Sequence, residues 1–189
     1  SAHIIDYIAL KYGRHYADQI LIDMDINPIF FDETDNQINL FFFIDLLNKL
    51  KKERHNINNL GSYIPLRIRK TKLGSILSYQ TKHDEFYSIL GSNTDILEKN
   101  FDYVIETTPA KIRIKSKFSD AFLEKSNPHN VCFENLFKYR YNMIRWFPIV
   151  SGLPPSHLKI SKVEETSSNY LICYEAKINN RYYDEHSNT

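Results

Sequence analysis

The strongest constraint on the fold is a change of hydrophobic period between residues 101 and 178. Apolar residues recur at every second position in two runs separated by a turn at 108–109, namely Phe101, Tyr103, Ile105, Ile112 and Ile114. The segments 157–163 and 170–178 alternate in the same way, and a helical pattern over 133–147 lies between them. Alternation indicates half-buried strands, and short alternating segments in sequence favour antiparallel pairing. The sequence therefore predicts two hairpins with one helix between them.

The first hundred residues have helical periods instead. An amphipathic pattern predicts one helix from Ile5 to about Met24, which Gly13 weakens without breaking. A second helix over 38–53 is apolar around most of its circumference, as buried helices are. We expect a turn or short helix at 56–61, an extended basic connector at 66–73, and a further helix that begins near Asp84.

These elements predict an α+β fold in a single domain, 1–189. The helical N-terminal half, 1–100, would pack on a four-stranded antiparallel sheet crossed by one long helix, and the sheet and that helix would come from 101–180.

Composition limits the partners and the cellular location that we expect for the protein. The 189 residues carry a net charge of +1, which gives no general attraction to nucleic acid or to an anionic membrane. The longest apolar run, Ile38 to Leu47, contains Asn39 and Asp45 and is too short to span a bilayer. Two cysteines form no disulfide framework. We therefore expect a reduced, cytoplasmic protein, and the Ser1-Ala2 start leaves us expecting a piece of something longer.

The 133–147 helix carries the most informative candidate site. One apolar stripe of this helix consists of Phe133, Leu136, Phe137, Ile144 and Phe147. Arg140 falls in the middle of that stripe, where a guanidinium needs hydrogen-bond acceptors. Two alternatives remain open. Arg140 forms a buried ion pair with Asp120, Glu124 or Glu106, or it binds the carboxylate or phosphate of a ligand through two parallel hydrogen bonds.

The opposite flank of the same helix carries Tyr139 and Trp146. Large rings that alternate with Asn135 and Asn142 fit a protein interface. Packing of these rings on the N-terminal half is the other interpretation. The first alternative predicts a dimerisation or protein-interaction surface.

Metal binding and catalysis have little support in the sequence. The seven histidines form no recognisable ligand set, and the proximity of His129 to Cys132 is weak evidence for one. The nucleophile-elbow, phosphate-loop and β-lactamase motifs do not occur. We expect no metal and no enzymatic activity, although an enzyme that uses Cys132 or Arg140 is a third alternative.

Three stretches of the chain resemble a known family of bacterial sensory domains. They are the opening Ile5–Gly13, the turn Gly152–Pro155 and the final strand with Cys173-Tyr174. The chain is similar to the haem nitric oxide/oxygen-binding (H-NOX) domain and its vinyl-reductase-like relatives, which precede histidine kinases, nucleotide cyclases or transcription factors. The resemblance implies a regulatory domain that binds a small ligand and signals to an output domain.

The resemblance also implies haem, but two departures argue against a cofactor. Family members that bind haem carry an axial histidine on the helix before the sheet, where this chain has 93–100 with no histidine. They also carry a Tyr-x-Ser-x-Arg motif, which does not occur between Ile112 and Arg140. We therefore expect a haem-free domain in which Arg140 binds an anionic group. The other residues expected at the ligand are Phe137, Met143, Ile144, Phe147 and His129.

Overall fold

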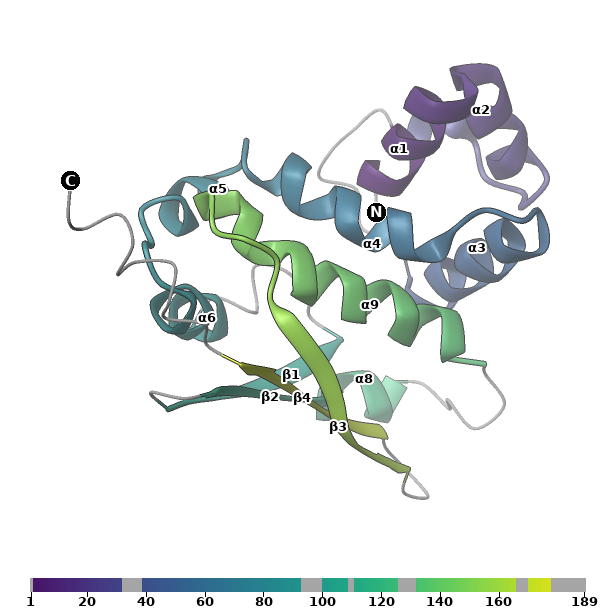
Figure 1. Ribbon diagram of the computed structural model, residues 1–189. Coiled ribbons are helices and arrows are strands. Elements are labelled where there is room, and N and C mark those ends of the chain that lie inside the picture. Colours follow the sequence, from purple (N-terminus) through teal and green to yellow (C-terminus); the bar gives the residue numbers. More distant parts are fainter. Residues whose placement is uncertain are drawn as a thin grey trace. The chain divides into compact units, whose positions relative to one another are not determined.

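The computed structural model describes residues 2–31, 39–92, 100–108, 111–125, 132–165 and 170–177 (Figure 1). Its helices are α1 (Ala2–Tyr12), α2 (Arg14–Ile22), α3 (Leu40–Lys52), α4 (Ile57–Ile68), α5 (Lys72–Leu77), α6 (His83–Ser92), α8 (Asp120–Lys125) and α9 (Glu134–Trp146), with 3₁₀ turns η1 (Pro28–Phe31) and η2 (Phe147–Ser151). Its strands are β1 (Phe101–Thr107), β2 (Lys111–Phe118), β3 (His157–Glu165) and β4 (Tyr170–Lys177). The α+β class and the hairpin–helix–hairpin order are confirmed.

The chain forms two compact units. Unit 1 consists of residues 1–68 and 132–144, and unit 2 consists of 69–131 and 145–189. The sequence placed a division near residue 100. In the structure α5 and α6 belong with the sheet, and most of α9 belongs with the N-terminal helices. That 1–189 acts as one domain stays a prediction.

The predicted first helix is wrong in its length. Gly13 has φ +96° and separates α1 from α2. A backbone angle in this region is costly for a residue with a Cβ atom, so glycine permits a sharp break here. Both helices still bury one apolar face in unit 1, which includes Ile5, Ile8 and Ile20, whereas Leu10 and Ile22 are exposed.

The predicted connector at 66–73 is also wrong, because α4 continues to Ile68 and α5 begins at Lys72. The buried residues of α4 recur at helical spacing, at Ile57, Leu60, Ile64 and Ile68. Burial of this apolar face outweighs the helix-breaking effect of Pro65. Thr71 then caps α5 by accepting a hydrogen bond from the Gly74 amide.

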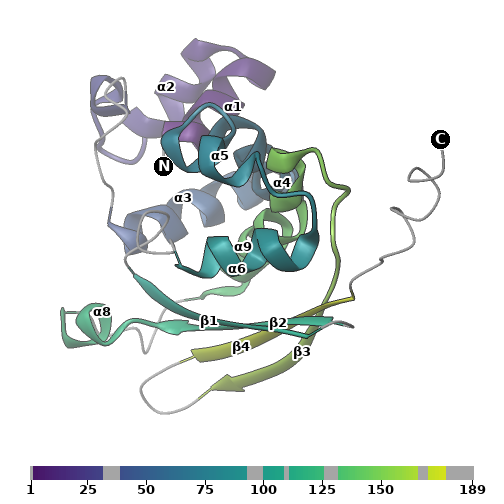
Figure 2. The ribbon, with the colours of Figure 1, turned by 90° about the vertical axis from the view of Figure 1, so that its left-hand side faces the viewer.

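Unit 2 contains the four-stranded sheet, in the order β1-β2-β4-β3, with all neighbours antiparallel. One face is buried, and its core residues include Phe101, Ile112, Ile114, Phe118, Ile172, Tyr174 and Ala176. Helix α6 lies along this face in Figure 2 and packs against β1, where Gly91 allows close approach to Ile105.

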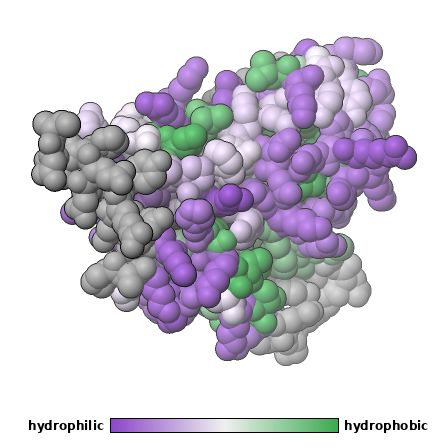
Figure 3. All heavy atoms as spheres, in the orientation of Figure 1, coloured by the Kyte–Doolittle hydropathy of each residue, from purple (hydrophilic) through white to green (hydrophobic). Residues whose placement is uncertain are grey.

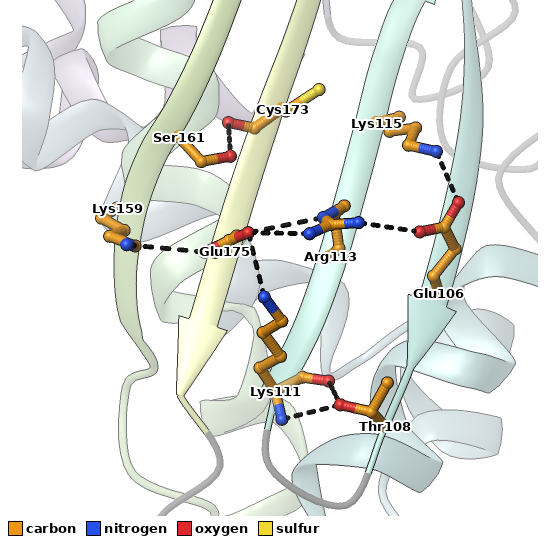
Figure 4. A network of polar contacts seen from close by, with 9 residues as sticks. All are labelled: Glu106, Thr108, Lys111, Arg113, Lys115, Lys159, Ser161, Cys173 and Glu175. Atoms are coloured by element: carbon orange, nitrogen blue, oxygen red, sulfur yellow. Dashed lines mark hydrogen bonds and ion pairs between the residues drawn. The ribbon is translucent and has the colours of Figure 1, made fainter.

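The other face of the sheet is charged (Figure 4). Glu175 on β4 accepts from Arg113 at 3.2 Å and from Lys111 at 3.4 Å, and Lys159 on β3 approaches it at 3.5 Å. Glu106 on β1 pairs with Lys115 at 2.5 Å. These pairs are partly exposed, so they contribute modestly to stability but keep this face hydrated.

Two further expectations can be compared with the described residues. Cys132, which is exposed, and Cys173, which is buried, are both free cysteines. Within the described ranges, no helix combines the length and apolar character that a membrane span requires. Hydrophilic residues cover most of the coloured surface in Figure 3, with apolar residues in small separate patches.

Candidate functional site

Helix α9 places the predicted site residues. It begins at Glu134, whose carboxylate lies in the first turn, and carries Arg145 in its last turn, both favourable for the helix dipole. Leu136, Arg140 and Ile144 recur at four-residue spacing and are therefore stacked on one face. Their exposed fractions are 0%, 1% and 3%.

The burial of Arg140 confirms the prediction that this guanidinium lies within the apolar stripe. Arg140 is the largest of the almost fully buried side chains in the described chain. Burying a guanidinium is unfavourable unless hydrogen-bond acceptors compensate for lost hydration. Arg140 therefore needs a hydrogen-bond acceptor, which belongs either to the protein or to a ligand.

Two of the carboxylates proposed as partners of Arg140 have other cations beside them. Glu106 pairs with Lys115 and with Arg113, and Asp120 lies 3.5 Å from Lys117. The hydrogen bond with Lys115 is the main cause that lowers the pKa of Glu106 below its ordinary value. Both alternatives for Arg140, an ion pair or a ligand, therefore stay predictions.

The remaining predicted ligand residues are distributed between the two units. Phe137 and Met143 are half-buried on the part of α9 that belongs to unit 1. Phe137 stacks on Phe133 with ring centroids 5.9 Å apart. Phe147 begins η2 in unit 2 and packs on Phe86 of α6 at 6.1 Å. His129 lies outside the described residues.

The opposite flank of α9 packs on α3 and α4 within unit 1. The ring of Tyr139 meets Phe43 edge-on, with centroids 5.2 Å apart, and is 8% exposed. Asn135 donates to Asn48 at 2.8 Å, and Asn142 donates to Asn58 at 3.0 Å. For Tyr139, these contacts match the alternative in which the ring packs on the N-terminal half.

Trp146 lies in unit 2 and is half-buried. It is the last residue of α9. A role for Tyr139 and Trp146 at an interface stays a prediction.

Close packing of α9 on α4 depends on Gly61, which the sequence reasoning missed. A Cβ atom at Gly61 would lie 2.3 Å from the Tyr139 carbonyl oxygen and 2.9 Å from the Asn142 Cβ. A glycine within a helical apolar pattern is the signal that could have indicated such an approach.

Unit 2 holds a second arrangement that the sequence did not indicate. Tyr87 on α6 is fully buried, and its hydroxyl lies 2.9 Å from the Ser156 hydroxyl. His83, at the start of α6, bonds through Nε2 to the Pro154 carbonyl oxygen at 3.0 Å. A carbonyl oxygen only accepts, so His83 Nε2 carries the proton. Two bonds thus join α6 to the loop before β3.

A polar cluster in unit 1 was likewise missed. The Tyr16 hydroxyl donates to Glu53 at 2.5 Å and lies 2.7 Å from His55 Nε2. Because a tyrosine hydroxyl has one proton, His55 Nε2 is the donor in the second bond. Burial and the bond to Glu53 raise the pKa of Tyr16 to about 12, and burial lowers the pKa of His55. Among the described residues no group of His, Cys, Asp and Glu could hold a metal ion.

Comparison with known proteins gives a fold but no close relative. No protein-family model and no curated protein matches the chain. Solved H-NOX structures match it over nearly its whole length. A point mutant of the Tt H-NOX has a TM-score of 0.67 and 11% identity, over 94% of this chain and 92% of that one.

Two further structures extend the comparison. An Fe(II) unliganded H-NOX mutant from K. algicida has a TM-score of 0.59 and 11% identity, over 95% of this chain and 96% of that one. An oxygen-binding H-NOX domain related to soluble guanylate cyclases, in its oxygen complex, has a TM-score of 0.55 and 13% identity, over 94% and 92%. The class is thus defined: the chain is an H-NOX-like domain in its fold. Tyr87 is buried on α6, the last helix before β1 that the structure describes.

The described donors on α6 do not fit an axial bond to haem iron. His83 uses Nε2 for the Pro154 carbonyl. Burial raises the pKa of Tyr87, which disfavours the phenolate that would bind iron. The segment 93–99 lies outside the described residues, and its sequence contains no histidine. The residues that the structure describes on this helix therefore do not support haem ligation.

Proposed function

We propose that this chain is a haem-free sensory domain that binds a small, anionic organic molecule and regulates an attached or separate output domain. The H-NOX fold over more than nine-tenths of the chain carries the proposal. The H-NOX structures that match include one described as oxygen-binding and one as an Fe(II) protein. We extend the sensory role of H-NOX domains to this chain, with an organic anion as the proposed ligand in place of a haem-bound gas.

Two features of the described residues support a ligand other than a haem-bound gas. The donors on α6 do not fit haem, and Arg140 is a buried cation on the same face of α9 as the buried Leu136 and Ile144. An arginine can hold a carboxylate or phosphate through two parallel hydrogen bonds. Phe137, Met143 and Ile144, which belong with Arg140 to unit 1, would form the apolar wall of its site, and the roles of Phe147 and His129 stay predictions.

Signalling in this proposal needs no chemical step. A ligand that binds one conformation better than another shifts the equilibrium by the difference in its affinities. The domain would therefore act as a regulator and not as an enzyme. Its proposed location is the cytoplasm. No nucleic acid or membrane takes part.

A protein-interaction module is the second candidate function. The half-buried Trp146 favours it, because tryptophan is enriched at interface hot spots. In this alternative Trp146→Ala would weaken a dimer or a complex with an output domain. A Trp146→Ala variant with unchanged concentration-dependent mass would remove Trp146 from consideration.

Haem titration tests the haem-free part of the proposal. The purified chain should show no stoichiometric Soret band after incubation with hemin and reductant, because the described donors of α6 are engaged. His83→Ala is the matched control, since it removes the one imidazole on α6. A stoichiometric Soret band would contradict the proposal, and its loss in His83→Ala would identify His83 as the haem ligand.

Arg140 gives the direct test of the anion site. Replacement by Met keeps most of the apolar stem and removes the charge, so we expect ligand affinity to fall about 10- to 150-fold, from roughly 1.5–3 kcal/mol per charged hydrogen-bonding group. Titration calorimetry with the molecule that copurifies with the chain measures the change. Severe loss of stability in Arg140→Met, with the unfolding midpoint far below that of the unmodified chain, would instead support a structural ion pair.

A further inference from the structure

The sheet of unit 2 ends in a strand whose outer side no described strand covers. The order β1-β2-β4-β3 makes β3 an edge strand. Two apolar residues of β3, Ile160 and Val163, are 48% and 56% exposed. Figure 3 shows apolar side chains along β3 between hydrophilic neighbours. An edge strand with accessible backbone groups and apolar side chains is a template for another strand.

A β-bulge determines which residues of β3 share a face. Register with β4 places Ile160 and Val163 on the buried face of the sheet, and Lys159 and Glu164 on the charged face. Ser161 is the extra residue of the bulge. Ile160 and Val163 therefore lie three residues apart and still share a face, which ordinary alternation would not allow.

We propose that β3 pairs antiparallel with β3 of a second copy of this chain, about a two-fold axis between Ser161 and Lys162. In this register Lys159 lies opposite Glu164 of the partner subunit, and Ile160 lies opposite Val163 of the partner subunit. The two-fold axis repeats each pair, as in any isologous interface. The resulting dimer has two Ile–Val pairs on one face and two Lys–Glu pairs on the other.

The bulge makes this register specific. A shift of one residue in either direction places Ile160 opposite Lys162 or Glu164 of the partner subunit, and both belong to the charged face. An apolar side chain and a charged one would then point to opposite sides of the combined sheet. Cross-strand pairs stabilise a sheet only when both members lie on the same face.

The order of charges along β3 supports self-pairing. Lysine on an edge strand usually opposes association, because like charges meet. On β3 the base Lys159 precedes the acid Glu164, so antiparallel pairing in this register sets these opposite charges against each other, while Lys162 lies opposite Ser161 of the partner subunit. Within one chain Glu164 pairs with Lys162, and Lys159, which is 66% exposed, approaches Glu175 at 3.5 Å. Exposed pairs of this kind exchange partners at little cost.

Charge reversal in solution tests the proposal. Sedimentation equilibrium of the 189-residue chain across a concentration series should show a monomer–dimer equilibrium. Lys159→Glu alone, or Glu164→Lys alone, should raise the dissociation constant about tenfold or more, because each places two like-charged pairs in the dimer. The double variant restores opposite charges and should recover the original constant within about threefold.

Matched controls separate pairing through β3 from general effects of charge. Lys177→Glu makes the same change of charge on β4 and should leave the mass unchanged. Val163→Lys should dissociate the dimer, whereas Val104→Lys, at a 54% exposed position on β1, should not. Circular dichroism verifies that each variant is folded.

Two results would overturn the inference. One is a monomer at every concentration. The other is a dimer that neither Val163→Lys nor the single charge reversals weaken. Because the test uses mass alone, its outcome does not depend on the ligand proposal.

Discussion

Two residues, Gly61 and His55, show how single positions determine the local geometry of unit 1. Gly61 lets α4 approach the backbone of α9, and His55 closes a polar cluster with Tyr16 and Glu53. The partners of these residues could not be predicted from the sequence, since Gly61 and Tyr139, for example, are far apart in the chain. Arg140 differs, because helical periodicity alone placed it in the stripe that is buried.

Gly61→Ala should destabilise the protein. Alanine has the higher helix propensity by about 1 kcal/mol, but its Cβ would overlap the Tyr139 carbonyl, and overpacking costs about 1–3 kcal/mol. Urea unfolding measures the difference. Asn59→Ala, at an exposed position of the same helix, is the control and should leave the midpoint nearly unchanged.

His55 should make stability depend on pH. Burial lowers its pKa in the folded chain, so the neutral ring is favoured there. The folded state then binds fewer protons than the unfolded state, and stability present above pH ~6.5 is lost as the pH falls. Burial also lowers the pKa of His3, which adds in the same direction.

The measurement is the unfolding midpoint in urea between pH 7.5 and 5.5. His55→Asn should flatten part of the slope, and His55→Asn with His3→Asn should flatten more of it. His15→Asn, which replaces an exposed histidine of α2, is the control. A slope unchanged in the His55 variant would contradict the account.

At the scale of elements, the second half of the chain was more predictable than the first. Alternation over 101–118 and 157–178 gave the strands, because one face of the sheet is buried and the other is charged. The end of α1 and the course of α4 were missed for opposite reasons. Gly13 breaks a helix that its apolar period would continue, whereas apolar packing around Pro65 maintains a helix that proline would break.

Helix α6 is held to the loop before β3 through Tyr87 and Ser156. Tyr87→Phe should lower the free energy of unfolding by roughly 1–2 kcal/mol, because it removes a buried hydroxyl that bonds to Ser156. Tyr79→Phe, at an 82% exposed position, is the control and should have little effect.

A double-mutant cycle isolates this contact. Ser156→Ala combined with Tyr87→Phe should cost less than the sum of the two single changes, since each single variant already breaks the bond. Additive effects in chemical unfolding would show that Tyr87 and Ser156 act independently.

For the whole molecule, fold and function differ in how much the sequence could predict. The α+β class and the H-NOX likeness followed from the order of elements. The ligand did not, because about 11% identity preserves an architecture without preserving the residues that select a ligand. Arg140 is where the residue pattern and the structure agree, and it is therefore the residue on which the proposed function depends most.

Native mass spectrometry of the chain purified from cells, with an absorption spectrum of the same sample, tests the central claim most directly. We predict a population heavier than the bare chain by one small molecule, reduced in Arg140→Met, and no Soret band. A stoichiometric Soret band would contradict the haem-free sensor. A bare chain with no bound molecule under any purification condition would contradict the ligand-binding role.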